Sequence, residues 1–159
     1  MKKRLVKINK IIATALGLGY FPKAPGTMGA LGGVLTGSIV IFWTNSPNLI
    51  LSLLITFFFF LGVFSSFKLE PMWGKDPSRI VIDEVVGMWI AILFIPKQWI
   101  AIFLAFCLFR FFDIFKPLYI RKFENLKGGW GVMTDDVVAG IYANIVIQIS
   151  NVVLIYFYK

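Results

Sequence analysis

The sequence predicts an all-α integral membrane protein: a compact bundle of about five transmembrane or membrane-embedded helices, preceded by an amphipathic interfacial helix. Composition is the first observation. Of the 159 residues, 58% are hydrophobic and 15% are charged, and the mean hydropathy is +0.82. Soluble domains are usually about 45–50% apolar and about 25% charged. The second observation is that no charged residue lies between Ala24 and Phe67, and the third is that the charges gather where apolar stretches end.

Turn signals divide the apolar sequence into five candidate spans. The segment NSPN at 45–48 separates the first two, and IPKQW at 95–99 joins the third and fourth as a helical hairpin. Each candidate is near the roughly 20 residues that cross a bilayer. The spans are expected at 27–44, 49–67, 80–95, 98–115 and 135–158. Residues 1–159 are expected to form one membrane-embedded domain.

The N-terminal segment 1–20 has a basic head followed by a short apolar stretch. A signal peptide has a similar pattern, but no convincing cleavage site follows. We therefore expect an amphipathic helix lying in the membrane interface. The glycines of the first span leave open whether it crosses the bilayer fully or re-enters.

Positive charges predict the orientation of the bundle. With five spans and the N-terminus inside, fourteen Lys and Arg residues fall on the inner side and two, Lys97 and Lys159, on the outer side. This positive-inside bias predicts a cytoplasmic basic face that contacts anionic lipid headgroups. Nucleic acid is not the expected partner, because the cations flank spans and form no separate basic module. The oligomeric state stays open.

All acidic side chains fall on the same inner side. Five of the eight lie at the ends of predicted spans: Asp83, Glu84, Asp113, Asp135 and Asp136. Antiparallel helices bring such ends to one membrane depth, so we expect these carboxylates to converge. The uncharged parts of the third and fourth spans are too short to cross the bilayer alone, which draws the acids to the lipid interface.

Each acidic group also has a structural explanation. Thr134 and Asp83 are candidate helix N-caps, and acids in a first turn complement the helix dipole. Asp113 can pair with Arg110 one turn earlier. The functional interpretation is that the five carboxylates hold Mg²⁺, which prefers carboxylate and water oxygens. Three acidic groups at one depth favour the metal site.

A glycine-rich turn, FPKAPGTMGALGG at 21–33, completes the pattern. Pro25 and Gly26 force a non-helical approach, Thr27 is a candidate cap, and the following helix N-terminus offers N–H groups to an anion. The alternative for this turn is a simple membrane-entry cap whose small residues allow close helix packing. The chain has no histidine and a single cysteine, Cys107, which excludes histidine-dependent hydrolases and cysteine phosphatases.

Three blocks of the sequence resemble the signature blocks of the phosphatidylglycerophosphatase A family. They are GLGYFPKAPGTMG at 17–29, IVIDEVVGMWI at 80–90 and FRFFDIFKPLYIRKFENLKGGWGVMTDDVVAG at 109–140. The blocks occur in the family's order, and the long third block is the most specific. The first two spans resemble the family only in being hydrophobic.

This resemblance implies a Mg²⁺-dependent membrane phosphatase in the bacterial inner membrane, multi-pass, with its active site facing the cytoplasm. The implied substrate is the phospholipid phosphatidylglycerophosphate, and the products are phosphatidylglycerol and inorganic phosphate. The family's acidic positions correspond to the five carboxylates named above, as catalytic and metal-binding residues, and its turn corresponds to Pro25, Gly26 and Thr27. Candidates to neutralise the substrate's phosphates are Lys23, Arg110, Lys116 and Arg121.

Two other functions fit the pattern of acids without the resemblance. Acids at helix ends also build cation or proton pathways, so a small transporter is the first alternative. A pathway usually places an acid near the bilayer midplane, whereas here the outer half of every predicted span lacks one. The second alternative is a structural membrane subunit that uses the clustered acids for ion binding.

Overall fold

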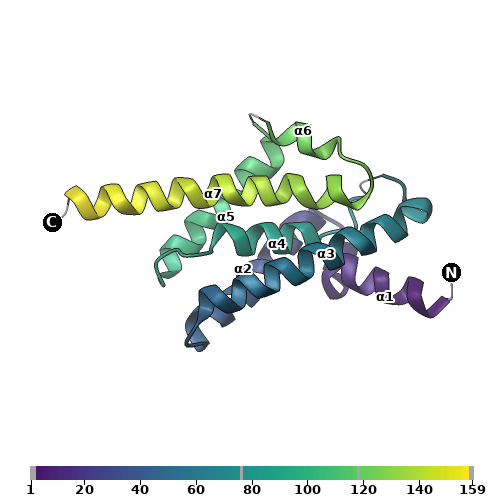
Figure 1. The fold of residues 1–159 in the computed structure, drawn as a ribbon, viewed down its shortest axis with the longest axis horizontal. Helices are drawn as coiled ribbons and strands as arrows, with labels where there is room; N and C mark the ends of the chain where they lie inside the picture. Colours follow the sequence, from purple (N-terminus) through teal and green to yellow (C-terminus); the bar gives the residue numbers. More distant parts are fainter. Residues whose placement is uncertain (1–2, 76, 118, 158–159) are drawn as a thin grey trace.

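The computed structural model describes residues 3–75, 77–117 and 119–157, and these residues form helices and no strands (Figure 1). The all-α fold class is therefore confirmed. The cations Lys2 and Lys159 and the acid Asp76 lie outside the described residues. The elements in chain order are α1 (Lys3–Ala13), the 3₁₀ helix η1 (Ala15–Tyr20), α2 (Pro25–Trp43), α3 (Pro47–Trp73), α4 (Ile82–Ala91), α5 (Trp99–Phe115), α6 (Ile120–Glu124) and α7 (Gly129–Phe157).

Three of these helices, α2, α3 and α7, are long and apolar enough to cross a membrane. With 27 residues, α3 extends past both ends of the expected range 49–67, and the 29-residue α7 begins six residues before the expected start at 135. By contrast α4 has 10 residues, a length of about 15 Å, and cannot cross a roughly 30 Å hydrocarbon layer. It ends at Ala91, short of the expected 95, and in the segment that follows Phe94 has a positive φ. The predicted fold class included helices that are embedded in the membrane without crossing it, and α4 is short enough to be one of them.

The N-terminal segment breaks into two elements. The amphipathic helix α1 ends at Ala13, and Thr14 then caps the separate η1 helix by accepting a hydrogen bond from Gly17 N at 3.1 Å. The α2–α3 and α4–α5 connections lie at the end of the bundle toward the C-terminus, and the N-terminus of the chain lies at the other end (Figure 1).

Helix α4 forms the centre of the bundle and packs chiefly against α7 and α2. Glycines permit this close packing. A Cβ added at Gly33 of α2 would lie 3.0 Å from the Val85 carbonyl oxygen and 2.8 Å from Met88 Cβ, so only glycine fits there. The structure thus uses small residues of the 21–33 segment for helix packing, as one interpretation of the sequence expected.

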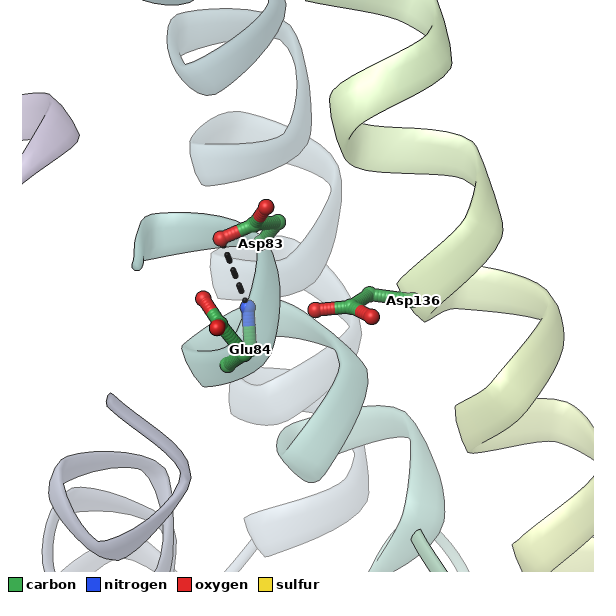
Figure 2. Close-up of side chains that lie close together, drawn as sticks. All are labelled: Asp83, Glu84 and Asp136. Atoms are coloured by element: carbon green, nitrogen blue, oxygen red, sulfur yellow. Dashed lines mark hydrogen bonds between the residues drawn. The ribbon is translucent and has the colours of Figure 1, made fainter. Parts of the chain in front are cut away.

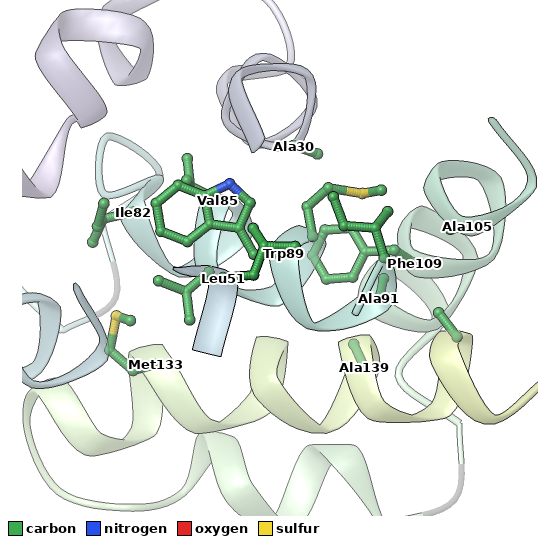
Figure 3. Packing of buried hydrophobic residues seen from close by; sticks show 14 of the residues in the cluster. Ala30, Leu51, Ile82, Val85, Trp89, Ala91, Ala105, Phe109, Met133 and Ala139 are labelled. Atoms are coloured by element: carbon green, nitrogen blue, oxygen red, sulfur yellow. The ribbon is translucent and has the colours of Figure 1, made fainter. Parts of the chain in front are cut away.

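Large apolar side chains fill the space around α4 (Figure 3). Phe109 of α5 and Met133 of α7 are fully buried there. Trp89 of α4 lies between α2 and α3: its ring meets Phe58 edge-on, and its Nε1 donates a hydrogen bond to Thr36 Oγ1 at 3.0 Å. The apolar core therefore fixes α4 from three sides, including the turn that carries Asp83 and Glu84.

Two amide side chains of α7 donate hydrogen bonds to backbone carbonyl groups at the C-terminal end of α4 and just after it. Asn144 Nδ2 lies 3.1 Å from the carbonyl oxygens of Ile90 and Ala91 and 2.7 Å from that of Leu93. Gln148 Nε2 lies 3.2 Å from the Phe94 carbonyl oxygen. Backbone groups that lack a partner in hydrocarbon are costly, so these amides allow α4 to end inside the bundle.

Replacing Asn144 by Leu is expected to lower thermal stability, because up to three carbonyl groups lose their donor. The cost is about 1–3 kcal/mol for a buried unsatisfied group, and the smaller values are typical within membranes. The matched control is Asn151→Leu, two turns later on α7, where the side chain makes no hydrogen bond to a described residue. Thermal unfolding in detergent checks this; equal midpoints for the two variants would contradict the capping role.

Candidate active site

Three carboxylates from two helices meet at the start of α4. Asp83 and Glu84 lie in the first turn of α4, and Asp136 of α7 points toward them (Figure 2). One oxygen from each lies within 4.8 Å of the others. Asp83 and Asp136 are 7% and 3% exposed, and Glu84 is half-buried. Asp83 Oδ1 accepts a hydrogen bond from Glu84 N at 3.0 Å, which orients the first carboxylate. We call Asp83, Glu84 and Asp136 the carboxylate triad.

The other two predicted acids lie beside the triad. Asp113, near the end of α5, interacts electrostatically with both Glu84 and Asp136. Its Oδ2 is paired with Arg110 Nη1. Asp135 interacts electrostatically with Asp83 and Asp136, and its Oδ2 lies 2.7 Å from Lys116 Nζ. The structure therefore brings together all five carboxylates and two of the four predicted cations.

The proposed helix caps are wrong, because neither residue lies at the position that precedes its helix. Helix α7 starts at Gly129, so Thr134 lies inside it and donates to the Trp130 carbonyl oxygen at 2.6 Å. Asp135 and Asp136 then belong to the second turn, beyond the free N–H groups that a cap would satisfy. The residue preceding α4 is Val81, so Asp83 is not its N-cap either.

The glycine-rich turn lies directly against the triad. Helix α2 starts at Pro25 after Ala24, which has a left-handed conformation, so Thr27 is not the cap that the sequence suggested. A Cβ added at Gly26 would lie 3.3 Å from Glu84 Cδ and 3.4 Å from Arg110 Nη1. A glycine here lets the turn approach both groups, because even a methyl group would clash with the Glu84 carboxylate.

Two predicted cations are not part of this arrangement. Lys23 and Arg121 are exposed, and neither forms an ion pair with a described residue. Sequence reasoning also missed Gly87 and Gly140, which set the distance between α4 and α7. A Cβ added at Gly87 would lie 2.7 Å from the Asp136 carbonyl oxygen. The sequence contains a pattern that could have identified them: each glycine lies four residues after a triad aspartate, on the same helix face.

The electrostatics of the triad fit a divalent cation. Two ionised carboxylates at this separation repel each other by about 3 kcal/mol at an effective dielectric constant of 20. Oε2 of Glu84 is buried, and no described residue donates a hydrogen bond to it. The nearby Arg110 and Lys116 are each already paired with an acid. Hard oxygen donors with uncompensated charge are what Mg²⁺ prefers.

Comparison with known proteins places the chain in a family. The sequence profile of phosphatidylglycerophosphatase A matches residues 11–151. Two proteins named phosphatidylglycerophosphatase A, from Haemophilus influenzae and Escherichia coli, are 41% and 37% identical to this chain. These alignments cover 91% and 88% of this chain and 91% and 83% of the relatives.

A third relative, named putative phosphatidylinositol-3-phosphatase, comes from Bacteroides thetaiotaomicron and is 45% identical over 96% of this chain and 99% of its own. No solved structure matches the chain. The family resemblance of the three sequence blocks is confirmed. The chain belongs to the phosphatidylglycerophosphatase A family and is a phosphatase.

Proposed function

We propose that the protein hydrolyses the terminal phosphomonoester of phosphatidylglycerophosphate, with Mg²⁺ held by the carboxylate triad, at the cytoplasmic face of the bacterial inner membrane. Five converging carboxylates within a membrane helix bundle carry this proposal. Two relatives named for this activity support the substrate. The excess of basic residues on the predicted inner side supports the orientation.

The residues present fit a metal held by Asp83, Glu84 and Asp136, with Asp113 and Asp135 beside it. When bound, Mg²⁺ supplies Lewis acidity toward a phosphoryl oxygen and lowers the pKa of a coordinated water. Arg110 and Lys116 lie at the same site, where they offset part of the acidic charge that would repel a phosphate dianion. The glycine at position 26 brings the backbone of the turn close to Glu84 and Arg110.

The chain also provides a group to accept the proton of the attacking water. Arg110 engages Oδ2 of Asp113, which leaves Oδ1 of that carboxylate to take the proton. Water adds to phosphorus, the ester P–O bond breaks, and the leaving glycerol oxygen receives the proton that Asp113 took from the water. The products are phosphatidylglycerol and inorganic phosphate. An aspartyl-phosphate intermediate on a carboxylate is the alternative route.

A second substrate has its own support. The Bacteroides relative is named for phosphatidylinositol 3-phosphate, and its identity to this chain is 45%. Both lipids carry a phosphomonoester on a polyol headgroup, so the same site can act on either. The transporter and structural-subunit alternatives predict no phosphate release at all.

The test is phosphate release by the purified protein from each lipid in detergent micelles with Mg²⁺. We expect release that EDTA abolishes and excess Mg²⁺ restores, because the triad needs a divalent cation. Release that persists in EDTA would contradict the metal assignment alone. No release from either lipid would contradict both proposed substrates.

A further inference from the structure

A second feature, separate from the carboxylates, lies beside the glycine-rich turn. A cavity of about 410 Å³ opens between the η1–α2 connection and the segment before α4. We call it the Arg79 pocket, after the one charged residue among the described residues that line it. Its lining residues are Gly19, Tyr20, Phe21, Pro22, Pro25, Ser78 and Arg79.

The two walls of the pocket are fixed to each other. Val81 N donates a hydrogen bond to the Ala13 carbonyl oxygen at 2.9 Å, which ties the segment before α4 to the end of α1. The backbone at Gly19 lies so close to Arg79 that an added Cβ would be 2.9 Å from the Arg79 carbonyl carbon. The position of Arg79 at the pocket is thus built into the fold.

The pocket is next to the carboxylate triad along both walls. Pro25 lines the pocket, and the next residue, Gly26, packs against Glu84. On the other wall, Arg79 precedes the first turn of α4, where Asp83 and Glu84 lie. Only short stretches of chain thus separate the pocket from the triad, so a headgroup whose phosphomonoester reaches the triad can extend toward the pocket.

Among the described residues that line the pocket, Arg79 supplies a cation that no described acid already binds. Arg110 and Lys116 are bound to carboxylates, whereas Arg79 is exposed and forms no ion pair with a described residue. A guanidinium group matches a phosphate with two parallel hydrogen bonds. The hydroxyl groups of Tyr20 and Ser78, in the same lining, add donors of the kind that phosphate oxygens accept.

We propose that the Arg79 pocket binds the phosphodiester of the lipid headgroup while the terminal phosphomonoester lies at the triad. This inference rests on the proposed phosphatase function and makes it more specific. The preferred substrate class is a lipid whose headgroup polyol joins a phosphodiester to a phosphomonoester. Phosphatidylglycerophosphate and phosphatidylinositol 3-phosphate both belong to it, whereas phosphatidic acid, which has no phosphodiester, does not.

The test compares phosphatidylglycerophosphate with phosphatidic acid in uncharged-detergent micelles, where the substrate supplies the only phosphodiester. Arg79→Ala is expected to lower kcat/KM for phosphatidylglycerophosphate about 10- to 100-fold, chiefly through KM, because a charged hydrogen-bond partner is lost. Activity on phosphatidic acid should stay within about threefold of wild type, and Arg79→Lys should recover part of the preference. The control Arg4→Ala removes one positive charge from α1, outside the pocket, and should leave kcat/KM for both lipids unchanged.

Other results would overturn the inference. If the ratio of kcat/KM for the two lipids is the same in Arg79→Ala as in wild type, Arg79 does not bind the phosphodiester. An equal loss of activity on both lipids would give that result. A loss that appears only when phosphatidylserine is added to the micelles would assign the pocket to bulk anionic lipid. No release from any lipid by the wild-type protein would overturn the proposed function itself, and this inference with it.

Discussion

Replacing Asp136 by Asn is expected to reduce phosphate release by roughly 1,000-fold, because the triad loses a charged ligand for the metal. Asp136 is the triad member that α7 contributes, and it is buried. An amide of the same shape keeps the packing and some hydrogen bonding but cannot replace the negative charge. The chemistry should therefore fail without loss of the fold.

When no metal is bound, the same substitution should leave the thermal stability unchanged or raise it, although it lowers activity. The triad oxygens lie within 4.8 Å of one another, so removing one charge relieves a repulsion of about 3 kcal/mol per ionised pair. Asp136→Asn should unfold at the same temperature as wild type in EDTA, or at a higher one. Mg²⁺ should raise the unfolding temperature of the wild type and leave that of the variant unchanged.

The measurements are phosphate release, thermal unfolding with EDTA or Mg²⁺, and Mn²⁺ binding followed by electron paramagnetic resonance. The matched control is Glu70→Gln on α3, which removes an acid outside the triad. It should retain near-wild-type activity and Mn²⁺ affinity. If Asp136→Asn unfolded at a lower temperature in EDTA yet still bound Mn²⁺, the carboxylate would be a structural partner and not a metal ligand.

The convergence of the acids could be predicted from the sequence, because charge in an apolar chain is a strong signal. Asp83, Asp113 and Asp136 stood out by their positions at the ends of hydrophobic stretches, and the structure gathers them. Placing acids at one membrane depth required only approximate helix ends. An error of several residues, such as the start of α7 at Gly129, changed the cap assignment without separating the carboxylates.

Features that depend on contacts between distant segments could not be predicted in the same way. The sequence does not show that α4 is only 10 residues long, because its end depends on Asn144 and Gln148 more than 50 residues away. Among the cations, which ones pair with acids is decided by side-chain geometry. Lys23 and Arg121 carry the positive charge that a phosphate site needs, but neither forms an ion pair with the described carboxylates. Arg79, by contrast, lies at a pocket formed by two separate segments of the chain.

Gly140→Ala is expected to lower activity about 100-fold, because a small displacement of catalytic groups has an effect of this size. At Gly140 the α7 backbone crosses α4 so closely that a Cβ would meet the Gly87 backbone, at 3.1 Å from its carbonyl carbon. Backbone atoms cannot move aside as a flexible side chain can. The two helices must separate, which draws Asp136, one turn earlier on α7, away from Asp83 and Glu84.

The control Gly32→Ala on α2 distinguishes this explanation from general helix propensity. At Gly32 an added Cβ would meet only the terminal Cδ1 of Leu18, at 2.6 Å, and that flexible group can shift. Helix propensity alone predicts that both alanine variants gain up to about 1 kcal/mol in the free energy of unfolding. Packing predicts that Gly140→Ala loses about 1–3 kcal/mol and that Gly32→Ala does not. Stabilisation of both variants with full activity would show that the α4–α7 distance does not limit the site. Destabilisation of Gly140→Ala alone, with weaker Mn²⁺ binding, would show that this glycine crossing holds the carboxylates together.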